Sequence, residues 1–323
     1  MTAGTVALMP GTSQASPTQS LSQVKAEVAS LNQQAEVAGQ QFDAAQEQYA
    51  ALQKKVDGLQ GQIVHEQSAL DSLENTMGLQ AAAQYRNGGI SPTLQLALNS
   101  SPEKYLSQAG IENQQAAQEA MLMKSITQEK AQLALDKKAA ATALAEEQQL
   151  VAQAAKHKAD VASTLTKEQS LLSTLTAQQR ATVVTAGVST SRYSGALPSV
   201  SGRAAAAVAY VKSKVGDPYV YGDTGPGAFD CSGLIYAAYA YAGMSIPRTS
   251  EEQAAAATSI SASDLQPGDV IYFYGYPPSH IGMYVGNGMF IDARNSNVGV
   301  VWGSLDPSSK YYSYMPVSGY GRF

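Results

Sequence analysis

The 323-residue chain contains one cysteine, three histidines and one tryptophan, and its 21 basic residues are fewer than its 26 acidic ones. A single cysteine excludes an internal disulfide, so Cys231 is a buried packing residue, a metal ligand or a nucleophile. Zinc sites need several cysteine or histidine ligands, and the chain is too poor in both to predict one. The net charge of −5 provides no basic surface for nucleic acid. No apolar run of the sequence reaches about 20 residues, the length of a membrane span.

The first residues, 1–20, lack a positively charged start. They do contain a short apolar stretch followed by Ser13-Gln14-Ala15, which fits the small-x-small pattern of a signal cleavage site. We interpret residues 1–20 as the remnant of a signal peptide and expect an exported protein. A disordered N-terminus is the alternative interpretation.

Residues 21–184 are poor in proline and aromatic residues, and their apolar residues alternate steps of three and four, which is typical of a coiled coil. The first series comprises Leu21, Val24, Val28, Leu31, Ala35, Ala38, Phe42, Ala45, Tyr49, Leu52, Val56, Leu59, Ile63, Leu70, Leu73 and Met77. A second series, weakened by charged residues, comprises Met123, Ile126, Leu133, Ala140, Leu144, Val151, Ala154, Val161, Leu165, Leu172 and Leu175. We predict a long antiparallel coiled-coil hairpin, with an intermolecular coil as the alternative.

The region at residues 86–110 interrupts the two series with Asn-Gly-Gly and two Ser-Pro steps. It predicts a tip with two short helices, at 92–98 and 102–109, each with proline in its first turn. The apolar residues Ile90, Leu94 and Leu98 lie in this tip. They pack on one another or form a docking surface for another protein.

Residues 185–202 contain glycine, serine and proline without periodicity, which indicates a flexible linker. Residues 203–323 hold the only tryptophan and most of the tyrosines and glycines, which indicates an independent domain. In this domain Cys231 begins a predicted helix, and Asp230 is the expected N-cap. The helix N-terminus should lower the thiol pKa, and its free N–H groups could bind an oxyanion.

A cysteine nucleophile needs a base, and His280 is the only histidine of this domain. Strands are predicted at 270–274, 280–285 and 289–293. A two-residue turn between the last two would put Asp292 on the face opposite His280. A three-residue turn with Gly288 in the left-handed conformation would pair residue 285 with 289 and place Asp292 on the face of His280, where it can orient the imidazole. We predict this second register.

Taken singly, Cys231 and His280 are typical of inert buried residues. Together with Asp292 they resemble the NlpC/P60 family of papain-like cysteine peptidases, which act in bacterial cell-wall turnover. The resemblance covers about residues 204–323 and depends on PYVYG, FDCSGL, IPRTSEEQ, LQPGDVIYF and HIGMYVGNGMFIDA, in the family's order. It implies an α+β fold with the nucleophile helix packed on a small antiparallel sheet. It also implies hydrolysis of the γ-D-glutamyl–diamino acid bond of peptidoglycan stem peptides, with no metal or other cofactor.

By this resemblance Cys231 is the nucleophile, His280 the general base and Asp292 the third, orienting residue. An acid at this third position departs from the histidine most common in the family and should strengthen the imidazolium. Tyr221 stands where relatives usually have tryptophan in the groove wall. The implied substrate-binding residues, three for the free α-amine of the stem peptide and a fourth in the groove, are Tyr219, Asp230, Ser232 and Ser250.

The N-terminal hairpin resembles the coiled-coil segments of actinobacterial and firmicute division hydrolases, which dock on a membrane transporter-like complex and can shield the active site. We therefore expect a secreted, cell-wall-associated D,L-endopeptidase whose activity is low until the tip binds a partner. A catalytically silent wall-binding or scaffold protein is one alternative. A papain-like acyltransferase or amidase is another.

Overall fold

The computed structural model describes residues 20–86, 102–184, 193–310, 312, 313 and 315–323. The predicted signal-peptide remnant therefore lies outside the described residues except for Ser20. The chain divides into two compact units, residues 1–45 with 153–323 and residues 46–152. Within the described ranges, no helix combines the length and the apolar character that crossing a membrane requires.

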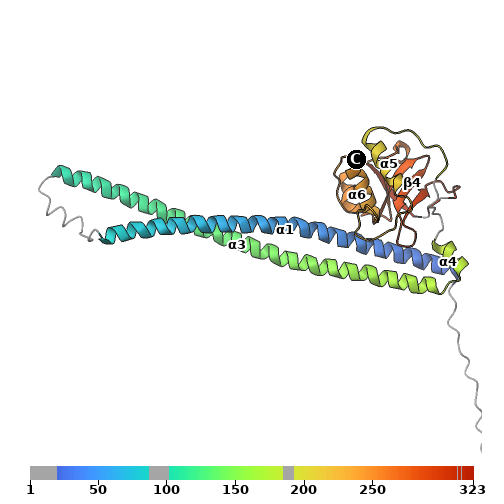
Figure 1. Ribbon diagram of the computed structural model, residues 1–323, viewed down its shortest axis with the longest axis horizontal. Coiled ribbons are helices and arrows are strands. Elements are labelled where there is room, and N and C mark those ends of the chain that lie inside the picture. The colour runs from blue at the N-terminus through green and yellow to red at the C-terminus, as the bar shows by residue number, and fades with distance from the viewer. Residues whose placement is uncertain (1–19, 87–101, 185–192, 311, 314) are drawn as a thin grey trace, which may run out of the picture. The chain divides into compact units, whose positions relative to one another are not determined.

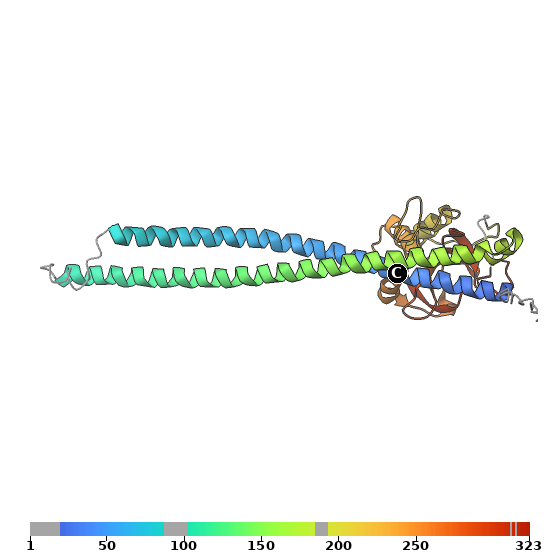
Figure 2. The ribbon, with the colours of Figure 1, turned by 90° about the horizontal axis from the view of Figure 1, so that it is seen from below.

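The two long helices of the chain are α1 (Leu21–Arg86) and α3 (Pro102–Ser173). In the unit of residues 46–152 they are antiparallel, because later positions of α1 contact earlier positions of α3. Glu74 pairs with Lys130 at 2.7 Å, and the Lys137 amino group donates to the Gln67 side chain at 3.4 Å. Figures 1 and 2 both show α1 and α3 lying side by side. The predicted antiparallel helical hairpin is confirmed.

The apolar seam of α1 faces its partner helix, as predicted. Its buried members are Val24, Val28, Leu31, Ala35, Ala38, Ala45, Val56 and Leu70. The seam of α3 departs from the prediction, since Met123, Leu144 and Val151 are exposed. Ile126, Leu133, Ala140, Val161 and Leu172 of this seam are buried as predicted, and Ala143 is buried in place of Leu144. A helical residue is turned about 100° from its neighbour, so contact through Ala143 directs Leu144 away from the partner.

The predicted tip and linker lie partly outside the described residues. The predicted helix at 92–98 and the apolar residues Ile90, Leu94 and Leu98 fall there. The second predicted short helix is not separate, because α3 begins at Pro102 and continues without a break. After α4 (Ala177–Val184), the part of the predicted linker from residue 193 packs against the core of the last domain through Tyr193, Leu197 and Val200.

The last domain is built on one antiparallel sheet with strand order β1-β6-β2-β3-β4-β5. The strands are β1 (Thr258–Ser259), β2 (Val270–Phe273), β3 (His280–Gly286), β4 (Met289–Ala293), β5 (Val300–Ser304) and β6 (Val317–Arg322). The helices are α5 (Gly202–Ser213), α6 (Cys231–Tyr241), α7 (Ser250–Ala256) and the short 3-10 helix η1 (Ala262–Asp264). The predicted α+β class is confirmed.

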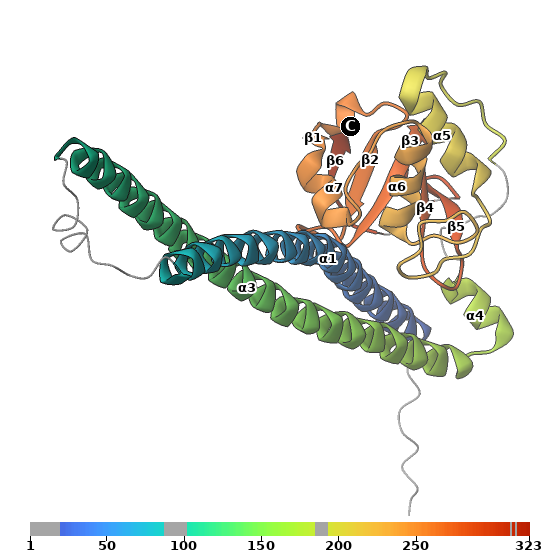
Figure 3. The ribbon, with the colours of Figure 1, turned by 60° about the vertical axis from the view of Figure 1, so that its left-hand side comes forward.

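The helices α5 and α6 pack against β3 and β4, and Figure 3 shows them on one face of the sheet. The core between these layers includes Leu234 and Ile235 of α6 with Ile281 and Met283 of β3. A smaller apolar cluster on the strands β2 and β4 contains Ile271, Phe273 and Phe290. The face of the sheet beneath α6 is apolar, and the packing of α6 on this face places the start of the helix beside β3.

The β3–β4 hairpin reaches the predicted alignment by a different route. The turn has two residues, Asn287 and Gly288, both with positive φ, and Gly286 pairs with Met289. A bulge between Tyr284 and Gly286 then shifts the register by one residue. The predicted pairing of residue 285 with 289 is wrong. The bulge has the same effect as the longer turn, since Met283 lies opposite Ile291 and residue 282 therefore lies opposite 292.

Candidate active site

Cys231 is the first residue of α6, and the predicted cap is present. The Asp230 carboxylate accepts a hydrogen bond from the Gly233 N–H at 2.6 Å, which satisfies one free donor of the helix. The sulfur is fully buried, and the S–H donates to the Ser279 carbonyl oxygen at 3.8 Å. The thiol therefore lies at the helix start that the sequence predicts, but out of contact with water.

Burial reverses the prediction of a lowered thiol pKa. Desolvation disfavours the thiolate and outweighs the hydrogen bond and positive charge of His280, so that the pKa of Cys231 is raised to about 11. In this conformation the sulfur is a neutral thiol.

His280 begins β3 and is fully buried, with carboxylates at both ring nitrogens. Its Nε2 lies 2.8 Å from Asp292 Oδ2, and its Nδ1 lies 2.8 Å from Glu36 Oε1. Burial lowers the pKa of the imidazole, but Glu36 and the hydrogen bonds to Asp292 and Cys231 outweigh it and hold the pKa well above its usual value. The ring is therefore an imidazolium.

Asp292 lies on β4 on the His280 side, as the predicted register requires. Burial raises the pKa of its carboxyl, but the Arg294 guanidinium and His280 outweigh burial and hold the pKa below its ordinary value. The Arg294 side chain contacts both oxygens, with Nε 2.5 Å from Oδ2 and Nη2 2.8 Å from Oδ1. Asp292 is therefore an ionised carboxylate that accepts from the imidazole.

Three polar residues of α1, from the same compact unit, complete this site. Glu36, Gln40 and Asp43 are spaced by four and three positions, so they share one face of the helix. Burial raises the pKa of Glu36, and the imidazolium of His280 offsets only part of this. Asp43 pairs with Arg248 at 3.2 Å and is buried.

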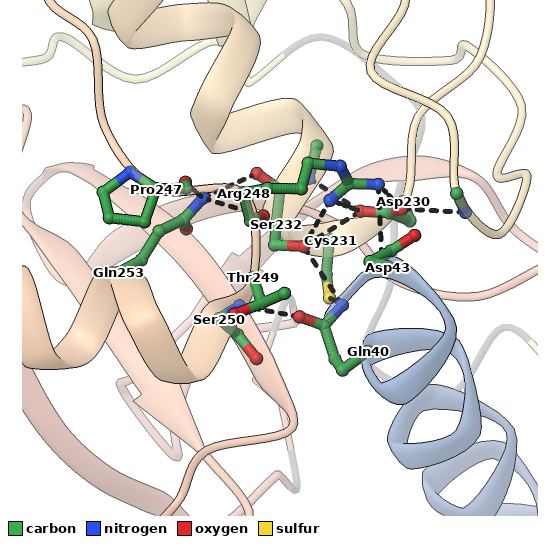
Figure 4. A network of polar contacts seen from close by, with 12 residues as sticks. Gln40, Asp43, Asp230, Cys231, Ser232, Pro247, Arg248, Thr249, Ser250 and Gln253 are labelled. Atoms are coloured by element: carbon green, nitrogen blue, oxygen red, sulfur yellow. Dashed lines mark hydrogen bonds and ion pairs between the residues drawn. The ribbon is translucent and has the colours of Figure 1, made fainter. Parts of the chain in front are cut away.

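The side-chain amide of Gln40 lies against the sulfur (Figure 4). Its Nε2 is 3.6 Å from Cys231 Sγ and donates to Ser232 Oγ at 3.0 Å, while its Oε1 accepts from the Ser250 N–H at 2.6 Å. The carboxamide of Gln40 thus occupies the space in front of the thiol, with both of its polar ends satisfied.

A glycine allows this close approach of α1. A Cβ atom built on Gly39 would lie 2.6 Å from Cδ1 of Tyr221. Tyr221 in turn packs edge-on against Tyr219, with ring centroids 4.8 Å apart. Glycine in a helix interior costs about 1 kcal/mol relative to alanine, so its presence here has a packing reason.

The four residues proposed for substrate binding surround the sulfur, and all are buried. Asp230 accepts from the Gly222 N–H and from Arg248, in addition to its cap bond. Ser232 and Ser250 contact Gln40, and Tyr219 forms the wall beside Tyr221. The Asp230 carboxylate is therefore neutralised by the protein itself.

Five residues of this site carry no sequence pattern from which they were predicted. Arg294 lies two residues after Asp292, and in an extended chain this spacing places both side chains on the same face. The spacing could therefore have indicated Arg294 as a partner of Asp292. Arg248 lies within the IPRTSEEQ motif but was not singled out. Glu36, Gln40 and Asp43 lie off the apolar seam of α1 and therefore had the pattern of a solvated helix face.

A thiol at a helix start, an imidazole on the next layer and a carboxylate behind it form a site of the papain-like cysteine peptidase kind. Residues 216–317 match the model described as NlpC/P60 family, so the C-terminal part of the chain is an NlpC/P60 domain.

Curated relatives match about a third of the chain. A probable endopeptidase of Corynebacterium glutamicum is 47% identical over 112 residues, which are 35% of this chain and 50% of that protein. The probable endopeptidase p60 of Listeria innocua is 42% identical over 107 residues, 31% of this chain and 23% of that protein. The chain thus spans half of the first relative and less of the second.

Solved structures give matches of similar extent. The chain is similar to NlpC2 from Trichomonas vaginalis, with 33% identity over 39% of this chain and 49% of that one, and a TM-score of 0.35. It is also similar to the NlpC/p60 domain of the peptidoglycan hydrolase SagA, with 28% identity over 37% of this chain and 98% of that one, and a TM-score of 0.33.

The buried imidazolium should make the stability of this unit depend on pH. An unfolded imidazole releases its proton near pH 6.5, whereas folded His280 keeps it to higher pH. The stabilisation is complete below pH 6.5 and is lost as the pH rises through the folded pKa. We expect the free energy of unfolding to fall above pH 6.5 by up to about 1.4 kcal/mol per pH unit from this group.

Urea unfolding between about pH 6 and 8.5, followed by the near-ultraviolet signal of the buried Trp302, measures this slope. The control is His280→Asn, which removes the titrating ring and should flatten the pH dependence. The same slope in both chains would contradict the assignment of a buried imidazolium.

Proposed function

We propose that the chain is an exported, cell-wall-associated cysteine endopeptidase that cleaves the γ-D-glutamyl–diamino acid bond of peptidoglycan stem peptides. The observation that carries this is the adjacency of Cys231, His280 and Asp292 inside the NlpC/P60 domain. The relatives named as probable endopeptidases support the reaction class. The secretory pattern of residues 1–20 and the cell-wall role of the family support export.

In the proposed reaction the Cys231 thiolate attacks the amide carbon while the imidazolium of His280 holds its counter-charge. N–H groups at the start of α6 stabilise the oxyanion. His280 then protonates the leaving amine, which leaves a thioester between Cys231 and the glutamyl carbonyl. A water molecule, deprotonated by His280, hydrolyses the thioester and restores the thiol. Asp292 holds the ring orientation through Nε2, so that Nδ1 faces the sulfur.

Substrate binding is assigned to Tyr219, Asp230, Ser232 and Ser250. The contacts of Gln40 support this assignment, since a glutamine side chain is a γ-carboxamide like the scissile group of the substrate. The Ser250 N–H holds its carbonyl oxygen, and Ser232 Oγ accepts from its amide nitrogen. The same two groups are positioned to bind a glutamyl amide once Gln40 has left.

We further propose that α1 regulates the site. Glu36 occupies Nδ1 of His280, the nitrogen that must face the thiol, and Gln40 fills the space before the sulfur. A second contact comes from α3, where Glu168 accepts from Asn297 at 2.8 Å. The chain in this conformation is inactive, and a partner that binds the tip near Ile90, Leu94 and Leu98, such as a membrane division complex, would release the helix.

A larger side chain at position 39 tests this regulation. Gly39→Leu raises helix propensity but places a side chain on Tyr221, and overpacking of this kind costs about 1–3 kcal/mol. Since 1.4 kcal/mol is a factor of ten in an equilibrium, alkylation of Cys231 by iodoacetamide should accelerate on the order of tenfold or more. Cys231 is the only cysteine, so the label reports this site alone.

Gly58→Leu is the matched control, because it makes the same exchange in α1 where nothing lies within 4 Å of the added atom. It should leave the alkylation rate unchanged. Equal rates for both variants and the parent chain would overturn the regulatory proposal. A thiol that reacts in none of them, even with urea below the unfolding transition, would favour a silent scaffold.

Hydrolysis is tested on the full chain carrying Gly39→Leu, with defined muropeptides and mass spectrometry of the products. We expect cleavage between D-glutamate and the diamino acid, and loss of turnover by at least about a thousandfold in Cys231→Ala. Turnover that survives this substitution would reject the nucleophile. Products from a different bond, or a transferred acyl group, would redirect the proposal to an amidase or acyltransferase.

A further inference from the structure

Arg294 has no role in the reaction as proposed so far, yet it is the side chain most tightly joined to Asp292. It lies two residues after Asp292 and is buried, with 8% of its surface exposed. Its backbone N–H donates to the Gly299 carbonyl at 2.9 Å, which continues the hairpin beyond β4 and keeps both side chains on one face. Both carboxylate oxygens of Asp292 contact the guanidinium.

The surroundings of Arg294 are shaped for a guanidinium. Its central carbon lies 5.8 Å from the ring centroid of Phe290, within the range of a cation–π contact. Gly303 on β5 leaves room for both groups, because a Cβ there would lie 2.4 Å from Phe290 Cζ and 2.9 Å from Arg294 Nη2. An arginine this buried, in space that a neighbouring glycine provides, is a specific feature of the site.

The charges around the imidazole explain why such a cation matters. The groups that face His280 are Asp292 and Arg294 from β4 and its extension, Cys231 from α6, Glu36 from α1 and Tyr274 after β2. A carboxylate without water is costly unless it is paired and hydrogen-bonded. Asp292 has only two cationic partners among these groups, Arg294 and His280 itself.

We propose that Arg294 is a positioning residue for catalysis: it holds Asp292 ionised and fixes both of its oxygens, so that Oδ2 keeps Nδ1 of His280 turned toward the sulfur. Arg294 also balances the charge of Asp292. The charge of the imidazolium is then left for the partner at Nδ1, which is Glu36 in the covered site and the thiolate of Cys231 in the open one. This inference depends on the proposed function.

Loss of the Arg294 cation should raise the pH at which Asp292 and the Cys231 thiol ionise. Burial raises the pKa of Asp292, and Arg294 is the strongest influence that lowers it. Without Arg294, Asp292 takes up a proton at higher pH, the imidazolium loses its anionic partner, and the thiolate forms only at higher pH. An opposite charge at this distance is worth about one to three pKa units.

The test uses the full chain with Gly39→Leu as the parent and adds Arg294→Met or Arg294→Lys. We measure the rate of Cys231 alkylation against pH, and muropeptide turnover against pH. With Arg294→Met the acid limb of both profiles should move up by about one to three pH units. Turnover at neutral pH should fall on the order of 10- to 100-fold, the usual effect of losing a partner that orients a site residue. Arg294→Lys keeps the charge with fewer contacts, so its acid limbs should move up by less than those of Arg294→Met.

Arg322→Met is the matched control. Arg322 holds Asp269 through two contacts of 2.7 Å, at the β6 edge of the sheet and outside the candidate site. Its loss should lower thermal stability without moving either acid limb. If Arg294→Met does not fold, Arg294→Lys alone decides, since a folded lysine variant must still show a smaller upward shift.

Unchanged acid limbs in a folded Arg294→Met chain, or equal shifts in Arg322→Met, would overturn the positioning role. The alkylation profile keeps this result separate from the proposed function. A parent chain that cleaves no muropeptide but whose thiol profile moves with Arg294 rejects the substrate and retains the positioning residue. The converse, cleavage with an Arg294-independent profile, rejects the positioning residue alone.

Discussion

The imidazolium of His280, held without water between two carboxylates, is the interaction on which the rest of the site depends. Each of its two ring nitrogens lies 2.8 Å from a carboxylate oxygen, and a ring that already carries both protons cannot take another from Cys231. A buried cation needs such partners, because the loss of hydration costs several kcal/mol for an unpaired ion. Whichever anion is at Nδ1 therefore decides whether the sulfur can ionise.

This constraint accounts for the unusual composition of one face of α1. A helix that only covered an apolar groove would present apolar side chains, yet here it presents Glu36, Gln40 and Asp43. Each of the three pairs with a polar group of the domain. Glu36 faces the imidazolium, Gln40 the two serines, and Asp43 the guanidinium of Arg248. The complementarity is polar, and water or a substrate with similar groups offers the domain the same kinds of hydrogen bond.

Much of the fold follows from local patterns in the sequence. The heptad spacing of residues 21–77 depends only on the helical period, and the start of α6 depends on the cap that the Asp230 side chain forms with the Gly233 N–H, three residues further on. The alignment of residue 292 with 282 was predicted by assuming a three-residue turn, although a two-residue turn followed by a bulge produces it. Sequence motifs predict these features because the contacts involved join residues that are close together along the chain.

The contacts of α1 could not be predicted in this way. Gln40 and Ser250 are 210 residues apart, and no periodicity connects a helix face to a loop at that distance. Glu36 and Asp43 had the spacing of solvated residues, and only the fold reveals that they are buried. The prediction of a lowered Cys231 pKa was wrong because it considered the local helix start alone. The fold buries the thiol completely, and this desolvation raises the pKa.

The charges of the site also link the position of α1 to the state of the sulfur. Asp230 and Asp292 are each joined to a buried arginine, so the acids next to the nucleophile contribute little net charge around it. Glu36 and Asp43 add two further acids when α1 is in place, and a thiolate formed beside them would have no cation left for itself. On the proposed release of α1, the charge of His280 would become available to the sulfur. Because such coupling is reciprocal, conditions that ionise Cys231 would then also weaken the binding of α1. In the proposed regulation the helix would thus act on the nucleophile through charge as well as by covering it.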